Sequence, residues 1–257
     1  MKRIIPVVVL VVLLSVTACA KQHGVAQEHR GEHSPSDPQN RELPFNIRHY
    51  GHFQKMVQNK DVAGTTDLKT AISAPNMYAV GALAGGAGEI TLLNSQVWLA
   101  YGKDGLDKTT TTIPQGEEAL LLVTAEVETW QEVVVPKEMS EEELHQFIVD
   151  QAAAHEIDPS APFPFLLEGH FDLEWHVVNG PNPDFQGHGG PPFLIQVKET
   201  VEQKAATIIG FYSADIQGVF THPGESWHLH VLFAEEEKAG HVDKLLVRDA
   251  VLKLPEK

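Results

Sequence analysis

The chain of 257 residues has one cysteine, Cys19, so no disulfide can form within it. Basic residues are also scarce: 19 Lys and Arg face 35 Asp and Glu, and the formal net charge is −16. No Lys/Arg run and no basic stripe with interleaved aromatics is present, and a surface of this charge repels phosphate backbones. The composition therefore excludes a disulfide-stapled mini-protein and leads us to expect no nucleic-acid partner.

The chain also lacks an apolar run long enough to span a bilayer. Its apolar stretch at residues 4–16 has about 13 residues, against the roughly 20 that a spanning helix needs. The stretch follows two basic residues and ends in small residues directly before Cys19, an order that resembles the lipobox of bacterial lipoproteins. We therefore expect residues 1–18 to be a signal peptide and Cys19 to be lipidated. The protein would then contact a membrane by its lipid anchor only, in the bacterial cell envelope, at the outer membrane or the periplasmic face.

Beyond Cys19 the composition separates a tether from a folded domain. Residues 19–44 are polar, with several histidines and prolines and little periodicity, which is typical of a flexible linker. Residues 45–257 have the hydrophobic patterns of a folded domain. Helical spacing predicts an amphipathic helix from Ile47 to about residue 59, a short turn of helix near 68–72, and a helix to about 155 that Ser140 and Glu143 begin with a capping box.

Strand patterns dominate the remainder of the domain. They are expected at residues 77–83, 89–93, 97–101, 119–135, 163–178, 193–197, 205–213, 227–233 and 241–254. The chain is therefore predicted to have a strand-rich α+β fold with mixed or antiparallel sheets and few helices.

The stretch with the clearest chemistry is at the C-terminal end. His228 and His230 alternate along a predicted strand, so both imidazoles project from one face. Residues 235–240 can form a hairpin turn that brings His241 beside the pair. Three neutral imidazoles around one point leave a fourth coordination position open, which is typical of a catalytic metal site; zinc is expected first, with another divalent metal as the alternative. The competing interpretation is three separate sheet histidines, each satisfied by hydrogen bonds.

This histidine block resembles that of the α-acetolactate decarboxylases, in which His-x-His is followed eleven residues later by a histidine that comes directly after glycine, as at His230 and Gly240-His241 here. The similarity extends upstream to residues 205–213. It also reaches residues 78–83 and 88–93, which are similar to the family's Gly-Leu-Gly-Thr-Phe segment and Asp-Gly-Glu hairpin. The resemblance implies an α+β fold with a zinc ion held by the three histidines on a C-terminal hairpin.

The resemblance also implies an activity: decarboxylation of 2-acetolactate, a small 2-hydroxy-3-keto acid, to acetoin and CO2. The metal would act as a Lewis acid on the substrate oxygens. Glu89 matches the family's hairpin carboxylate at the metal, and it is the candidate that returns a proton to the product. Without the resemblance, Glu89 would be interpreted as an exposed turn residue. Because the family is often dimeric, a homodimer is also implied.

The sequence departs from the family at several positions. The family's mid-chain arginine, in an Arg-x-Val-Pro context and expected to bind the substrate carboxylate, has no counterpart in residues 174–180. His176 is there instead, either as a substrate-binding substitute or as an ordinary sheet histidine. Replacing Val177 with arginine would return a guanidinium to this strand and restore the contact only if the register inferred from the resemblance is correct. The family's second active-site glutamate, beyond the last metal ligand, is also missing. Ala82 and Ala87 replace the family's threonine and aspartate.

Two other functions are compatible with the histidines. In a cupin-like barrel, His228, His230 and Glu235 would form the metal site of an oxygenase or isomerase. Alternatively, an envelope lipoprotein could keep the fold and metal yet only bind a metabolite or a partner protein, as the missing arginine and glutamate would favour.

Overall fold

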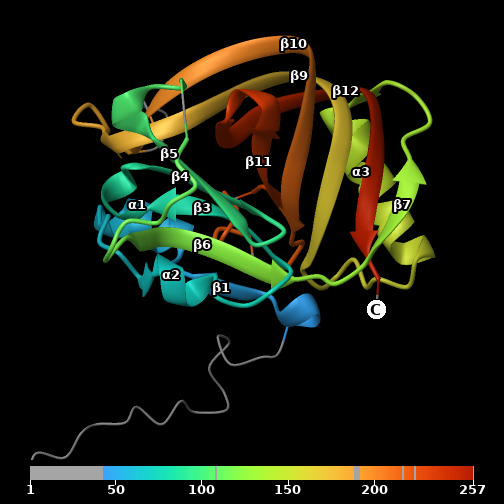
Figure 1. The fold of residues 1–257 in the computed structure, drawn as a ribbon, viewed down its shortest axis with the longest axis horizontal. Helices are drawn as coiled ribbons and strands as arrows, with labels where there is room; N and C mark the ends of the chain where they lie inside the picture. Colours follow the sequence, from blue (N-terminus) through green and yellow to red (C-terminus); the bar gives the residue numbers. More distant parts are fainter. Residues whose placement is uncertain (1–42, 108, 188–191, 216, 223, 257) are drawn as a thin grey trace, which may run out of the picture. The chain divides into compact units, whose positions relative to one another are not determined.

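Two antiparallel β-sheets make up most of the described chain in the computed structural model (Figure 1). The structure describes residues 43–256 apart from 108, 188–191, 216 and 223, and these belong to a compact unit, Glu42–Lys257. The predictions for the signal peptide and Cys19 therefore lie outside the described residues. Within the described part of the chain, no helix is long and apolar enough to cross a membrane.

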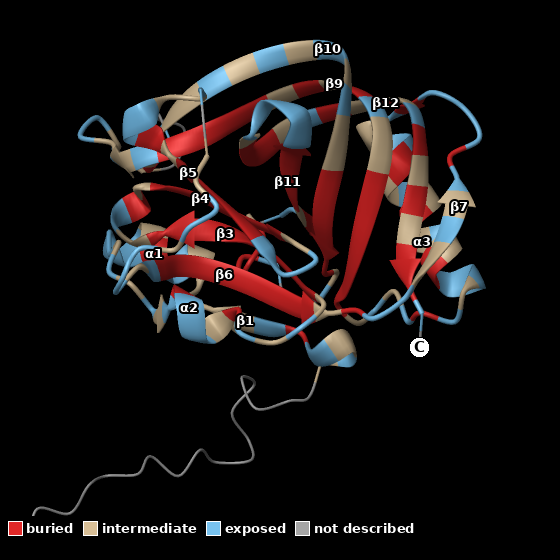
Figure 2. Cartoon of the chain, in the orientation of Figure 1, coloured by how far each residue is buried: buried red, intermediate tan, exposed pale blue. Residues whose placement is uncertain are grey.

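The first sheet has the strand order β1-β6-β3-β4-β5, and β2 also pairs with β6. Its strands are β1 (Arg48–Tyr50), β2 (Thr66–Asp67), β3 (Met77–Leu83), β4 (Gly88–Leu93), β5 (Gln96–Tyr101) and β6 (Glu118–Glu126). Nearly all residues of β3, β4 and β6 are buried (Figure 2). Because both faces of this sheet are covered, its strands appear in the sequence as continuous apolar runs rather than as alternating patterns.

The second sheet has the order β11-β10-β9-β12-β7, with β8 also paired to β12. Its strands are β7 (Trp130–Val134), β8 (Met139–Ser140), β9 (Phe163–Pro181), β10 (Leu194–Tyr212), β11 (Trp227–Phe233) and β12 (Lys238–Pro255). β11 pairs with β12 as well as with β10, so the path β11-β10-β9-β12 returns to β11. The predicted strand-rich α+β class is thus confirmed, and all pairings in both sheets are antiparallel.

The inner faces of the two sheets pack on each other, and helices cover part of their outer faces. A buried cluster joins residues of both sheets, among them Val80, Val123, Ile209 and Leu232. The short helix α2 (Leu68–Ala71) packs on the other face of the first sheet. Helix α1 (Phe53–Asn59) belongs to a separate cluster, in which its Met56 packs with Leu121 and Phe193. Helix α3 (Glu141–Ala154) buries its apolar stripe in the core of the second sheet. The inner faces are therefore where side chains from the two sheets meet.

The structure confirms the predicted start of α3. The Ser140 hydroxyl oxygen accepts a hydrogen bond from the Glu143 backbone N–H at 3.3 Å, and the Glu143 carboxylate accepts one from the Ser140 backbone N–H at 3.0 Å. This reciprocal arrangement satisfies two donors that the first turn of a helix leaves free. The capping motif was therefore sufficient to locate the helix from sequence.

Three predicted elements are wrong in their extent. The helix expected from Ile47 begins only at Phe53, because residues 48–50 pair with β6 as β1 and Gly51 turns the chain at φ 76°. Residues 119–135 form two strands, β6 and β7, that belong to different sheets. Finally, residues 193–197 and 205–213 are parts of the single strand β10, whose polar middle continues the pairing with β9 through register shifts.

Candidate metal centre

The hairpin of β11 and β12 brings three histidines to one point. Its register sets His230 directly opposite His241, and His228 projects from the same face of β11. One ligand nitrogen from each of the three residues lies within 4.8 Å of the others. A turn at Ala234–Glu236 and Glu237 at φ 55° close the hairpin. The predicted convergence of His228, His230 and His241 is therefore present.

Burial keeps these imidazoles neutral. Burial and, to a smaller extent, the neighbouring histidines lower the pKa of His228 to about 3 and that of His230 and His241 well below the ordinary value. A neutral imidazole has a free lone pair, which is the form that binds metal ions. Among the described residues, His228 Nδ1 and His230 Nε2 have no hydrogen-bond partner although both atoms are buried. Because a buried polar atom without a partner is costly, the donor set fits a metal ion that would satisfy both.

Glu89 comes to this point from the other sheet. It lies on β4, is only 4% exposed, and places Oε2 3.6 Å from His230 Nε2. Its Oε1 accepts a hydrogen bond from the Val178 backbone N–H at 3.2 Å. Burial raises the pKa of Glu89 to about 7, although His176 and the Val178 N–H act in the opposite direction. The interpretation of Glu89 as an exposed turn residue is therefore wrong.

Thr91 is a residue of the site that sequence reasoning missed. It lies two residues after Glu89 on β4, so both side chains point from the same face. The Thr91 hydroxyl is 2.9 Å from His230 Nδ1, and both residues are fully buried. The alternation Glu-x-Thr along a strand was the available signal, but it becomes meaningful only once the two sheets are packed.

His176 is brought beside the three histidines by the register of β9. It pairs with His241 across β9 and β12, and the two ring centroids are 4.9 Å apart. His176 Nδ1 lies 2.9 Å from Asp243 Oδ1, and Nε2 lies 3.3 Å from Gln196 Nε2. The register shift between Val242 and Lys244 leaves Asp243 as an extra residue in β12, which turns its carboxylate to His176.

Asp243 remains a carboxylate at this position. Burial acts to raise its pKa, but hydrogen bonds and electrostatic interactions with His176 and Lys198 outweigh burial and hold the pKa below its ordinary value. Lys198 Nζ is 2.9 Å from Asp243 Oδ2. The anionic Asp243 therefore has two hydrogen-bond partners and can hold the His176 ring in one orientation.

His222 is a further histidine that sequence reasoning did not select. It lies between β10 and β11, and its ring stacks on His241 at 5.5 Å and on Phe53 at 4.2 Å. Burial lowers its pKa. No motif or periodicity surrounds His222, so the sequence gives no sign that it reaches the site. The segment between β10 and β11 brings it there by passing over α1, where the Phe53 N–H donates to the Val219 carbonyl oxygen.

Two residues that the sequence suggested for the site, Val177 and Glu235, do not contribute to it. Val177 is fully buried in the hydrophobic core with α3, on the opposite face of β9 from His176. An arginine there would not face the site, so the choice of Val177 was wrong. Glu235 is exposed in the turn after β11 and is not among the residues that could hold a metal together, which removes the ligand that the cupin-like interpretation required.

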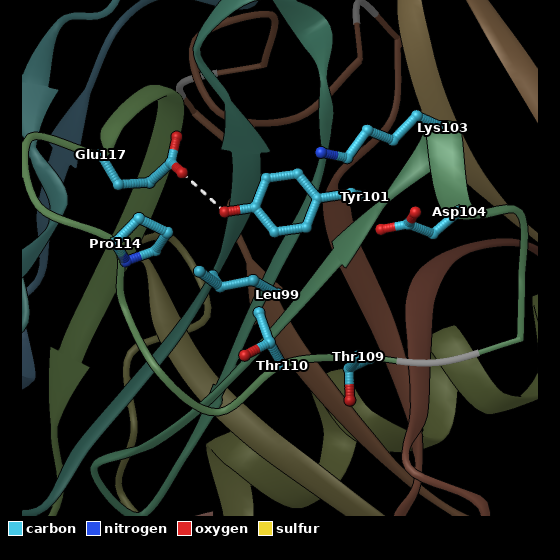
Figure 3. Close-up of a pocket in the computed structure, with 8 residues that line it drawn as sticks. All are labelled: Leu99, Tyr101, Lys103, Asp104, Thr109, Thr110, Pro114 and Glu117. Atoms are coloured by element: carbon cyan, nitrogen blue, oxygen red, sulfur yellow. Dashed lines mark hydrogen bonds between the residues drawn. The ribbon is translucent and has the colours of Figure 1, made fainter.

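A separate pocket of about 390 Å³ lies near the end of β5 (Figure 3). Tyr101 donates a hydrogen bond from its hydroxyl to Glu117 Oε2 at 2.6 Å, and Lys103 Nζ lies 5.2 Å from the centre of the Tyr101 ring. None of its lining residues belongs to the histidine site.

The fold and site define a class: a strand-rich α+β protein of two packed antiparallel sheets with a buried histidine group suited to a divalent metal. The family model for alpha-acetolactate decarboxylase matches residues 50–256, and the chain belongs to this family. No curated protein sequence is significantly similar to it.

Solved structures of the family share the fold. The alpha-acetolactate decarboxylase of Bacillus subtilis strain 168 is similar with a TM-score of 0.66 and 15% sequence identity, over 82% of this chain and 85% of that one. A Staphylococcus aureus protein of unknown function, described as similar to alpha-acetolactate decarboxylase, has a TM-score of 0.62 and 16% identity over 82% and 85% of the two chains. At this identity the likeness shows the common fold.

Proposed function

We propose that this protein is a metal-dependent carbon–carbon lyase that converts 2-acetolactate to acetoin and CO2. Family membership supports a lyase acting on a small molecule. The observation that supports the proposal most directly is the meeting of three neutral imidazoles and one buried carboxyl group at a single point. These are the parts that a decarboxylation requires: a metal site with an open position and a nearby proton donor.

His228, His230 and His241 would hold the ion, zinc or another divalent metal, and when bound it would supply a Lewis acid for the hydroxyl and carbonyl oxygens of the substrate. Glu89 has the proton-transfer role. Breaking the bond to the carboxylate releases CO2 and leaves an electron pair on carbon, which needs one proton to give acetoin. Burial raises the pKa of Glu89 to about 7 in the metal-free protein, so this carboxyl group is suited to hold and donate a proton.

His176 is assigned to the substrate carboxylate, in place of the family's arginine. Asp243 contacts Nδ1, so Nε2 is the atom that would donate to the substrate carboxylate when the ring is protonated, in place of its present 3.3 Å contact to the Gln196 amide nitrogen. No arginine of the described residues is a better candidate: Arg48 is exposed on β1, and Arg248 is paired with Asp172 and Glu138. The lack of an arginine is also the observation that favours the second candidate, a metal- or metabolite-binding envelope lipoprotein without catalysis.

Metal analysis and turnover on one preparation test both candidates. Purified protein loaded with zinc, manganese or cobalt is given racemic 2-acetolactate, and acetoin is measured by a colorimetric assay against a His230→Ala sample. The proposal expects about one metal ion per chain and acetoin formation that disappears in the variant. Full metal occupancy without acetoin would refute the lyase and support the binding protein.

We also propose that residues 1–18 are removed and that Cys19 is lipidated, so that the domain of residues 45–257 is anchored in the cell envelope. The order of basic residues, apolar run and small residues before Cys19 supports this arrangement. We propose a homodimer only because members of the family are often dimeric. Sedimentation velocity of the purified protein would test this oligomeric state.

A further inference from the structure

Strand β4 presents two side chains to a single histidine of the opposite sheet. Glu89 Oε2 is 3.6 Å from His230 Nε2, and the Thr91 hydroxyl is 2.9 Å from His230 Nδ1. His230 is therefore approached at both ring nitrogens by residues that lie two positions apart on one strand. Only the contact to Thr91 is within hydrogen-bond distance.

The two nitrogens of His230 are in different situations. Thr91 and His230 are both 0% exposed, so solvent does not compete for their hydrogen bond. Nε2 is buried and has no hydrogen-bond partner in the part of the chain that the structure describes. A neutral imidazole has one N–H and one lone pair. Placing the N–H at Nδ1 gives it an acceptor in Thr91, whereas placing it at Nε2 would leave a buried donor without a partner.

We propose that Thr91 is a positioning residue that accepts a hydrogen bond from His230 Nδ1–H and so keeps the Nε2 lone pair free for the metal. The proposal rests on the metal centre of the proposed function. Histidine ligands are generally oriented by such a contact at their second nitrogen. Thr91 is suited to the task because its branched side chain has restricted rotation and β4 is held between β3 and β5.

Thr91→Val tests this role, since valine keeps the branched shape and removes the acceptor oxygen. Thr124→Val is the matched control: Thr124 is also 0% exposed and lies on β6 of the same sheet, but its hydroxyl has no hydrogen-bond partner among the described residues. Thr91→Ser retains the oxygen. The Zn²⁺ and Co²⁺ dissociation constants of each protein are measured at pH 7.5 by competition with a chromophoric chelator, after circular dichroism has verified folding.

The expected result is a loss of about 10- to 100-fold in metal affinity for Thr91→Val. Thr124→Val should stay within about twofold of the wild type, and Thr91→Ser should recover most of the affinity. In the metal-free wild type, ¹⁵N–¹H correlation NMR of the histidine rings should assign the proton of His230 to Nδ1. A general loss of packing would instead weaken both valine variants and would not be repaired by serine.

A folded Thr91→Val protein with unchanged metal affinity would overturn the proposal. So would a wild-type His230 that carries its proton at Nε2, and this measurement needs no variant and no metal. These results can be distinguished from a failure of the proposed function. A wild-type protein that binds no metal would refute the metal centre, whichever ring nitrogen of His230 carries the proton. If Thr91→Val fails to fold, the wild-type tautomer decides.

Discussion

Replacing Glu89 with glutamine should separate catalysis from metal binding and reveal the cost of burying this carboxylate. Glutamine keeps the oxygen that accepts from the Val178 N–H but cannot give up a proton. If Glu89 protonates the product, turnover should fall by about 10² to 10⁴, the usual size of a lost proton-transfer group. The metal content should remain at the wild-type level, because the three histidines are untouched.

The same substitution should change how stability depends on pH. The pKa of Glu89 rises from 4.5 to about 7 on folding because the group is buried. Between these values the folded protein holds a proton that the unfolded chain has lost, so this group lowers stability as pH rises. At about 1.4 kcal/mol per pH unit the full penalty is about 3 kcal/mol above pH 7, and it disappears below pH 4.5.

Urea unfolding of the metal-free proteins between pH 5 and pH 8.5 measures this penalty. The difference in unfolding free energy, Glu89→Gln minus wild type, should increase with pH and level off near pH 8 at up to about 3 kcal/mol. Contributions from groups that do not interact with Glu89 are common to both proteins and cancel in the difference. A difference that does not change with pH would refute the raised pKa, and wild-type turnover by the variant would refute the role as proton donor.

Four further substitutions test the remaining residues of the site and the proposed lipidation of Cys19. His230→Ala should lose the metal, and full occupancy by elemental analysis would contradict the site. Asp243→Asn should raise KM for acetolactate about tenfold with unchanged metal content, because His176 loses its charged partner; an unaltered KM would show that this pair does not serve the substrate. Val177→Arg should lower the unfolding free energy by roughly 4 kcal/mol or more, because it buries an unpaired charge; wild-type stability with a lower KM would contradict that. Cys19→Ser should abolish labelling by a fatty-acid analogue, and labelling that persists would exclude lipidation there.

Local chemistry in the sequence was sufficient for the features that depend on near neighbours. The capping box located α3, and strand alternation followed by a hairpin turn brought His228, His230 and His241 together. In both cases the interacting groups are close in sequence, so periodicity and turn geometry determine which side chains share a face. The strand-rich α+β class followed from the same patterns, whereas the purely antiparallel pairing was seen only in the structure.

Contacts between distant segments were decided by the tertiary structure alone. Thr91 and Glu89 reach His230 only because the inner faces of the two sheets pack together, and a separation of 139 residues between Thr91 and His230 leaves no periodic signal. Val177 was misassigned because adjacent residues of a strand point to opposite faces, so an error of one residue exchanges the site for the core. Asp243 reaches His176 through a bulge in β12, and such an extra residue depends on the pairing with β9 rather than on the local sequence.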